Sequence, residues 1–170
     1  MEQKQIDQEI LRLIEQQPDI TNKEIARILS LPENMIEDLL EELSDTRQKI
    51  LIVDDELDAL TALKRALEAD NYNVVEAADG LSAIEKVKTE KPNVVLLDLM
   101  MPEMDGIEAC KHLKSDPKYK HIPIIMLTAK GEIDNKIEGI EMGADDYVTK
   151  PFNLHELKAR IKMVLRRAQD

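Results

Sequence analysis

The spacing of apolar residues changes once along this chain, and the change divides it into two parts. In residues 1–46 the apolar positions recur every three or four residues, which predicts amphipathic helices. From residue 49 onward, short continuous apolar runs alternate with helical stripes, which predicts strands that alternate with helices. We therefore predict two domains, residues 1–46 and residues 47–170.

The first part is predicted to be a small three-helix bundle. Pro18 follows the first apolar stripe, and Thr21 with Glu24 forms a capping box that opens the second helix. Pro32 fits the first turn of a third helix. The predicted inward faces comprise Ile6, Ile10, Leu13 and Ile14, then Ile25, Ile28 and Leu29, then Ile36, Leu39, Leu40 and Leu43.

The second part is predicted to be an α/β domain. Its expected strands cover residues 49–53, 74–77, 93–98, 122–127 and 147–148. The third of these is apolar almost throughout, which predicts a strand buried on both faces. Five strands that alternate with helices favour a doubly wound parallel sheet with right-handed crossovers. The expected helices have apolar stripes at Leu60, Leu63 and Leu67; Ile84 and Val87; Ile107, Cys110 and Leu113; Ile133, Ile137 and Ile140; and Leu157, Ile161, Val164 and Leu165.

Composition narrows the class of protein. The single cysteine, Cys110, rules out an internal disulfide and fits a reducing cytoplasm. The polar start of the sequence predicts no secretory leader, and no apolar run approaches the ~18 residues of a membrane span. The net charge of −12 argues against non-specific attraction to nucleic acid or to anionic membranes. Residues 1–46 hold 4 Lys/Arg and 12 Asp/Glu, so −8 of this charge lies there and −4 in the remainder.

Five polar residues follow or end the predicted strands: Asp54, Asp55, Asp98, Thr128 and Lys150. In open α/β sheets, ligand chemistry occurs at the carboxyl ends of the strands, so we expect these side chains to converge. Clustered carboxylates suit a hard divalent cation such as Mg²⁺. A metal and an ammonium beside one carboxylate suit phosphoryl transfer, in which the carboxylate attacks in line.

These residues, with the motifs around them, resemble those of a known family. Asp54-Asp55, Asp98, Met101-Pro102 with Asp105-Gly106, Thr128-Ala129 and Lys150-Pro151 are similar, in order and spacing, to the receiver domain of two-component response regulators. The resemblance covers residues 49–170. It implies a flavodoxin-like fold with strand order 2-1-3-4-5, together with a sensor histidine kinase or phosphotransfer protein as the partner.

The resemblance also implies the roles of the acidic residues. Asp98 is the expected phospho-acceptor. Asp54 and Asp55, together with Asp98 and the main-chain carbonyl of Met100, are the expected ligands of Mg²⁺.

Three further residues receive roles from the same resemblance. Lys150 is expected to pair with the phosphoryl group, and Thr128 to donate a hydrogen bond to it. Tyr147 occupies the position of the switch aromatic. The Lys150–Pro151 peptide bond is expected to be cis, which proline permits at low energy.

The last strand and helix resemble those of receivers that dimerise on phosphorylation. By this resemblance we expect a symmetric dimer in which Lys136 meets Glu156 and Asp146 meets Arg160 across the interface, with Asp145 on the same face. Such receivers normally precede a C-terminal winged helix, whereas this sequence ends at Asp170. We therefore expect that effector to be absent, and residues 1–46 form a module that precedes the receiver, which is an unusual order.

Residues 19–32 resemble the helix-turn-helix of winged-helix regulators of the leucine-responsive type. DNA is nevertheless the less favoured partner, because acids on a recognition helix oppose approach to phosphates. No wing follows before the next strand. A helical module for protein contacts or dimerisation is the preferred interpretation. The expected recognition helix contains five acids and no base: Glu33, Glu37, Asp38, Glu41 and Glu42.

Three functional hypotheses follow. The first is a response regulator in which phosphorylation of Asp98 alters protein contacts. The second is a phosphorylation-controlled transcription regulator that binds DNA through residues 1–46. The third is a phosphatase that uses the same carboxylate and Mg²⁺ chemistry; it is disfavoured because Met100 stands two residues after Asp98, where a general acid would be needed.

Overall fold

The structure is a computed structural model, and it describes residues 2–101, 103–129 and 143–169. The chain separates into two compact units, Met1–Thr46 and Arg47–Asp170. Among the described residues, no helix is long and apolar enough to cross a membrane.

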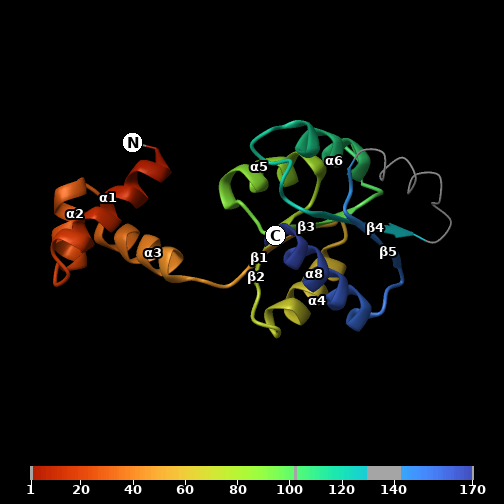
Figure 1. Ribbon diagram of the computed structural model, residues 1–170, viewed down its shortest axis with the longest axis horizontal. Helices are drawn as coiled ribbons and strands as arrows, with labels where there is room; N and C mark the ends of the chain where they lie inside the picture. Colours follow the sequence, from red (N-terminus) through yellow and green to blue (C-terminus); the bar gives the residue numbers. More distant parts are fainter. Residues whose placement is uncertain (1, 102, 130–142, 170) are drawn as a thin grey trace. The chain divides into compact units, whose positions relative to one another are not determined.

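The first unit consists of α1 (Gln3–Gln16), α2 (Asn22–Leu29) and α3 (Glu33–Ser44), as Figure 1 shows. The capping box predicted for α2 is present. The Glu24 amide donates to the Thr21 hydroxyl at 3.2 Å, and the Thr21 amide donates to the Glu24 carboxylate at 2.8 Å. The core of this unit is aliphatic and comprises Ile6, Ile10, Ile25, Ala26, Ile36 and Leu39.

Two residues that were expected to face inward do not. Ile28 is 53% exposed and Leu43 is 37% exposed. The buried residues of α2 are Ile25 and Ala26, and Ile28 lies on the other side of Ile25 from Ala26, on the flank of this two-turn helix. Leu43 lies in the last turn of α3. An apolar spacing therefore overestimates the width of the buried face in helices this short.

The second unit is built on five parallel strands in the order β2-β1-β3-β4-β5, which confirms the predicted sheet. The strands are β1 (Lys49–Val53), β2 (Asn73–Ala77), β3 (Val94–Asp98), β4 (Ile124–Ala129) and β5 (Asp146–Lys150). All five residues of β3 are buried, as expected for a central strand of a parallel sheet.

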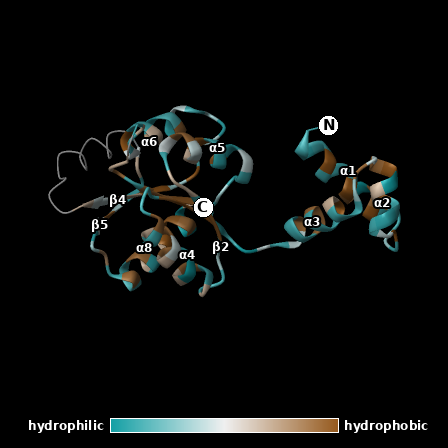
Figure 2. Cartoon of the chain, turned by 180° about the vertical axis from the view of Figure 1, so that it is seen from behind, coloured by the Kyte–Doolittle hydropathy of each residue, from teal (hydrophilic) through white to brown (hydrophobic). Residues whose placement is uncertain are grey.

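Helices cover both faces of this sheet (Figure 1). On one face, α4 (Leu57–Glu68) and α8 (Leu154–Gln169) pack with Ile50, Ile52 and Leu96. On the other face, α5 (Gly80–Glu90) and α6 (Gly106–Ser115) pack with Leu51, Val95 and Leu97. Hydrophobic residues accordingly gather on the strands and on the inner sides of these helices (Figure 2).

Some element boundaries differ from those expected. The expected strand 122–127 begins at Ile124, because the Ile122 amide donates to Tyr119 in a turn and Pro123 has no amide hydrogen. β4 ends at Ala129, so Thr128 lies inside this strand. Lys150 is the last residue of β5 rather than the residue after it. The expected helix with Ile133, Ile137 and Ile140 lies outside the described residues.

Candidate functional site

Sheet register brings the three predicted acids together. Val53 of β1 pairs with Leu97 of β3, so Asp54 and Asp98, the next residues of each chain segment, lie side by side. One carboxylate oxygen from each of Asp54, Asp55 and Asp98 lies within 4.8 Å of the other two. Asp54 and Asp98 are buried, whereas Asp55 is exposed. The cluster is therefore open to solvent on one side.

Lys150 completes this group of charges from the end of β5. Its Nζ lies 2.9 Å from Asp54 Oδ2 and 3.6 Å from Asp98 Oδ1. Partial burial by itself would lower the pKa of Lys150, but the hydrogen bond to Asp54 and the charge of Asp98 outweigh it, so the pKa is raised. Lys150 therefore remains protonated beside Asp98. The Lys150–Pro151 bond is cis, as predicted.

Asp98 is the carboxyl group whose environment is most altered. Burial raises its pKa to about 6, and the charges of Asp54 and Asp55 add to this shift. The Lys150 ammonium and a hydrogen bond from the main-chain amide of Met100 act in the opposite direction. A buried carboxylate with a raised pKa is a stronger nucleophile than an ordinary surface aspartate, and it is typical of a functional site.

The loop between β3 and α6 begins beside Asp98. Within it, the Gly106 amide donates to the Leu99 carbonyl at 2.8 Å and closes the base of the loop. A Cβ at Gly106 would lie 2.3 Å from the Asp98 carbonyl oxygen, so only glycine fits at this position. The Met100 side chain is 58% exposed. Met100 thus belongs to the site through its main chain and not through its side chain.

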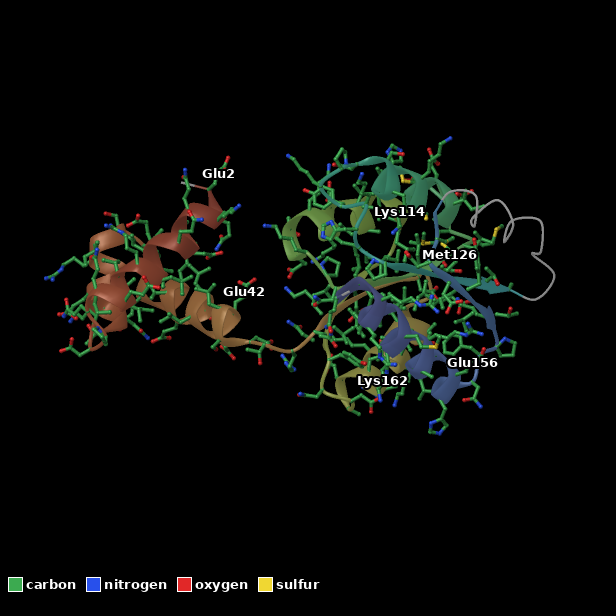
Figure 3. All side chains as sticks on the ribbon, viewed as in Figure 1. Glu2, Glu42, Lys114, Met126, Glu156 and Lys162 are labelled. Carbon is green, nitrogen blue, oxygen red and sulfur yellow. The ribbon has the colours of Figure 1, made fainter. Side chains whose placement is uncertain are left out.

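Thr128 and Tyr147 lie at the positions that the parallel register dictates. Leu127 of β4 pairs with Asp98, so Thr128 lies one residue further toward the same sheet edge, and it is buried. Tyr147 of β5 pairs with Met126, whose buried position in the sheet is labelled in Figure 3. Burial raises the pKa of the Tyr147 hydroxyl to about 12.

The donor set at this site fits a hard divalent cation. The three carboxylates offer only oxygen ligands, which a hard cation prefers. Lys150 relieves their mutual repulsion on one side of the cluster. The exposed side, at Asp55, leaves room for the waters that Mg²⁺ retains. Asp54, Asp55 and Asp98 are therefore suitable ligands for Mg²⁺, and the expected further ligand, the Met100 carbonyl, stays a prediction.

The residues assigned to a dimer face have partners within the chain. Arg160 Nη1 donates to both carboxylate oxygens of Asp146 at 2.9 Å, and its Nε donates to Glu156 at 3.1 Å. The positions of Glu156 and Lys162 on α8 are labelled in Figure 3. Lys136 lies outside the described residues. The expected intermolecular pairs stay a prediction.

Asp145 has a structural role that the sequence did not indicate. Its Oδ2 accepts a hydrogen bond from the Ile124 amide at 2.8 Å and lies 3.0 Å from Lys114 Nζ. Lys114 also donates to the carbonyl of Ile122 at 2.8 Å. Asp145 and Lys114 therefore join α6 to the starts of β4 and β5, at the sheet edge opposite the acidic cluster. No short sequence motif predicts this contact, because the residues that form it are far apart in sequence.

The acids predicted on α3 are all on its exposed side. Among the described residues, none of these five carboxylates has an ion-pair partner; Glu42, near the end of the helix, is labelled in Figure 3. Several are spaced four residues apart, where like charges repel. Residues 45–48 form no strand before β1 begins. All charged residues of α3 are therefore acidic, and all of them are exposed.

Two family profiles match this chain. The profile of the response regulator receiver domain matches residues 50–162. A profile described as a winged helix-turn-helix DNA-binding domain matches residues 3–47. Together they cover both units of the structure.

Curated relatives match the second unit. The alkaline phosphatase synthesis transcriptional regulatory protein PhoP of Bacillus subtilis is 49% identical over 122 residues, covering 72% of this chain and 50% of PhoP. The phosphate regulon transcriptional regulatory protein PhoB of Pseudomonas aeruginosa is 52% identical over 118 residues, covering 69% of this chain and 52% of PhoB. The chain therefore spans about half the length of the curated relatives it matches.

Solved structures show the same fold in the second unit. The chemotaxis protein CheY4 of Vibrio cholerae has 34% sequence identity and a TM-score of 0.66, covering 70% of this chain and 99% of CheY4. A CheY-like receiver domain protein of Methanospirillum hungatei has 31% identity and a TM-score of 0.69, covering 73% of this chain and 98% of its own.

Proposed function

The chain belongs to the response regulator receiver domain family, and on this premise we propose that it accepts a phosphoryl group on Asp98 from a histidine kinase or phosphotransfer protein. The observation that supports this most directly is the convergence of three carboxylates within 4.8 Å, with the Lys150 ammonium in contact with two of them. This is the arrangement that phosphoryl transfer to a carboxylate requires.

In the proposed reaction, a carboxylate oxygen of Asp98 attacks phosphorus in line. The new bond joins this oxygen to phosphorus, and the bond from phosphorus to the donor's histidine nitrogen breaks. Asp54, Asp55, Asp98 and the Met100 carbonyl would hold Mg²⁺, which would neutralise charge on the transferring group. Lys150, 3.6 Å from Asp98, and the hydroxyl of Thr128 then bind phosphoryl oxygens of the product.

Labelling with a small phosphodonor tests this assignment. Incubation with radiolabelled acetyl phosphate and Mg²⁺ should label the wild-type chain, and Asp98→Ala should abolish the label. Asp58→Ala is the matched control, because it removes an exposed acid in the first turn of α4. Undiminished labelling of Asp98→Ala, mapped to another residue, would refute the assignment.

For the output, we propose that phosphorylation alters protein contacts through a symmetric dimer of the second unit. The charged residues on and beside β5 and α8 support this, because an isologous contact would use each complementary pair twice. In the described chain Arg160 is bound by Asp146 of the same chain. Dimerisation would therefore exchange existing pairs for equivalent ones, so apolar contacts would have to supply affinity. Val164 cannot supply it, because this residue is buried in the core of its own chain.

DNA binding by residues 1–46 is the second candidate. The winged helix-turn-helix profile over residues 3–47 favours it, and PhoP and PhoB are named as transcriptional regulators. The five exposed acids of α3 oppose it, since a recognition helix must approach phosphates. Electrophoretic mobility shift with a randomised duplex pool at physiological salt separates the two outputs. Retention of a specific sequence by the phosphorylated chain would favour the regulator of transcription.

A further inference from the structure

The second half of α8 carries cations that no carboxylate of the described chain neutralises. Earlier in this helix, Lys158 lies 3.0 Å from Asp70 and Arg160 lies 2.9 Å from Asp146. The later cations are exposed and have no ion-pair partner among the described residues: Lys162, Arg166 and Arg167. Cations are favoured near a helix C-terminus. Their charge alone therefore does not indicate a partner, and their surroundings have to be considered.

A hollow beside Arg167 gives this end of α8 a defined shape. Its volume is about 130 Å³, and it is lined by residues that precede β4 and β5 and by residues of α8: His121, Pro123, Asp145, Val164, Arg167 and Ala168. Asp145 is already engaged, because its Oδ2 lies 3.0 Å from Lys114 Nζ and accepts a hydrogen bond from the Ile124 amide. The hollow is therefore able to receive a further carboxylate, which would lie against the Arg167 guanidinium.

The exposed residues of this half of α8 form one continuous face. Lys162 and Arg166 are one turn apart, and Met163 and Arg167 are one turn apart beside them. The Met163 side chain is 44% exposed, so an apolar group lies among the three cations. We call these four residues the basic face. It suits a second helix with acids at the same spacing, because each turn of one helix would then lie against a turn of opposite charge on the other.

The helix α3 has acids at that spacing. Its residues Glu37, Asp38, Glu41 and Glu42, here called the acidic face, repeat the spacing of the basic face residue by residue. All four are exposed, and none has an ion-pair partner among the described residues. Figure 3 labels Glu42 on α3 and Lys162 on α8. Glu41 and Glu42 lie in the last turn of α3, where the helix dipole disfavours negative charge and no basic residue compensates it. Cations brought against this face would relieve that cost.

A second copy of this chain fits the basic face better than nucleic acid does. Affinity for DNA rises with the number of phosphates that cations neutralise, and the basic face offers only three cations. The acidic face matches it in spacing as well as in sign. The first unit is also the strongly acidic part of the chain, since residues 1–46 hold 12 Asp/Glu against 4 Lys/Arg.

We propose that the acidic face of α3 in one copy binds the basic face of α8 in a second copy. Opposite charges at matched spacing would set the orientation of the two helices, and one carboxylate would occupy the hollow beside Arg167. Two copies that exchange this contact reciprocally would form a closed dimer. Neither face includes Asp98 or a proposed Mg²⁺ ligand, so the contact goes beyond the proposed function and should be the same with and without phosphorylation.

Sedimentation velocity of the unphosphorylated full chain tests the proposal. Exposed ion pairs are individually weak, so the contact should be observed at high protein concentration and low salt. Self-association should be present at about 0.1 M salt, where charges act over about 10 Å, and should be lost at about 1 M, where they act over about 3 Å. A chain that stays monomeric at the lower salt, up to its highest soluble concentration, would overturn the proposal.

Charge reversal on either face should weaken this association. Lys162→Glu with Arg167→Glu reverses the basic face, and Glu37→Lys with Glu42→Lys reverses the acidic face at the same spacing. Either double variant should raise the dissociation constant of self-association by at least about tenfold, because like charges would then face each other.

A matched control separates this contact from the effect of net charge. Lys88→Glu with Lys111→Glu reverses two exposed lysines, one on α5 and one on α6, and changes the net charge as much as reversal of the basic face does. It should leave self-association as it is in the wild type. An equal loss in this control would show that the association depends on overall charge, and it would overturn the proposal.

Mixing the two reversed variants gives the decisive measurement. The acidic face left intact in one variant meets the basic face left intact in the other, and the two reversed faces are also complementary to each other. The equimolar mixture should therefore associate at about 0.1 M salt, although neither variant does so alone. A mixture that stays monomeric, with both variants folded by circular dichroism, would overturn the proposal. All these measurements use unphosphorylated protein, so they stand even if Asp98 is not labelled.

Discussion

The two units each hold a group of carboxylates, and the groups differ in how they are held. Asp54, Asp55 and Asp98 come from two strand ends, lie within 4.8 Å of one another and are joined by Lys150. The five acids of α3 lie along the exposed side of a single helix, without an ion-pair partner among the described residues. The first group converges on one point, whereas the second spreads over a surface.

Acidic residues carry different information according to whether they converge or lie along one helix. Carboxylates that converge from separate strands repel one another, and this costs free energy that a bound cation or a proton offsets. Such a group therefore indicates a functional site. Repulsion along an exposed helix is screened by water and salt, and each pair costs only about 0.2–0.5 kcal/mol. The acids of α3 therefore argue against contact with anions such as DNA phosphates, whereas the acids at the strand ends favour binding of a cation.

The largest effect should come from removing an acid of the converging group. Asp55→Ala should raise the Mg²⁺ concentration for half-saturation by about 100-fold, because Asp55 is the solvent-facing proposed ligand. Isothermal titration calorimetry measures this directly. Glu33→Ala removes an acid of α3 and should leave Mg²⁺ binding as it is; an equal loss in both variants would abolish the distinction between the two groups.

The next effect concerns stability and pH. The pKa of Asp98 is raised to about 6 from an ordinary value of 3.8, so the folded state binds more protons than the unfolded state between these values. Metal-free protein should therefore become more stable as pH falls from 7 to 5. Asp98→Asn should raise the free energy of unfolding at pH 7 by about 1–3 kcal/mol and remove this dependence. Urea unfolding at both pH values checks the expectation, which a wild-type stability independent of pH would contradict.

A smaller effect is expected on the first unit. Glu37 lies four residues from both Glu33 and Glu41, so Glu37→Lys should replace two repulsions by two attractions and stabilise α3 by about 1 kcal/mol. Hydrogen exchange of the α3 amides in the full chain measures this. Glu9→Lys is the opposite control, since Glu9 pairs with Arg12 at 2.6 Å and the variant should loosen α1. Faster exchange in α3 of Glu37→Lys would indicate that its acids have stabilising partners.

The smallest effect concerns the proposed dimer. Arg160→Glu should weaken phosphorylation-dependent dimerisation by only about 0–1 kcal/mol per exposed pair, and it should leave labelling of Asp98 intact. Sedimentation velocity of the phosphorylated protein measures the change. Arg166→Glu on the exposed side of α8 is the control. A phosphorylated wild type that remains monomeric well above micromolar concentration would exclude this face as the output.

Much of the fold was predictable because hydrophobic spacing reports burial. The strand Val94–Asp98 is buried along its whole length, and its unbroken apolar run predicted this burial. Spacing says less about where burial stops, so the exposure of Ile28 and the start of β4 after Pro123 were missed.

The candidate site was predictable as a set of residues because parallel strands end at one edge. Tertiary contacts elsewhere in the second unit were not. The packing of Met104 on Gly80 and the bond from Asp145 to the Ile124 amide join segments that are distant in sequence, and no local pattern encodes them. Contacts of this kind depend on tertiary packing, which residue spacing does not reveal.

The order of the strands has a consequence for how the protein is made. Asp54 follows β1, whereas Lys150 is at the end of β5, the last strand. These two contacting residues are therefore separated by nearly a hundred residues of sequence. At about 5–20 residues per second, several seconds pass between the emergence of Asp54 and that of Lys150. The helices of the first unit are complete before either. A nascent chain can therefore hold a folded first unit while Asp98 still lacks the Lys150 ammonium beside it, so the charged cluster is complete only after β5 has been made.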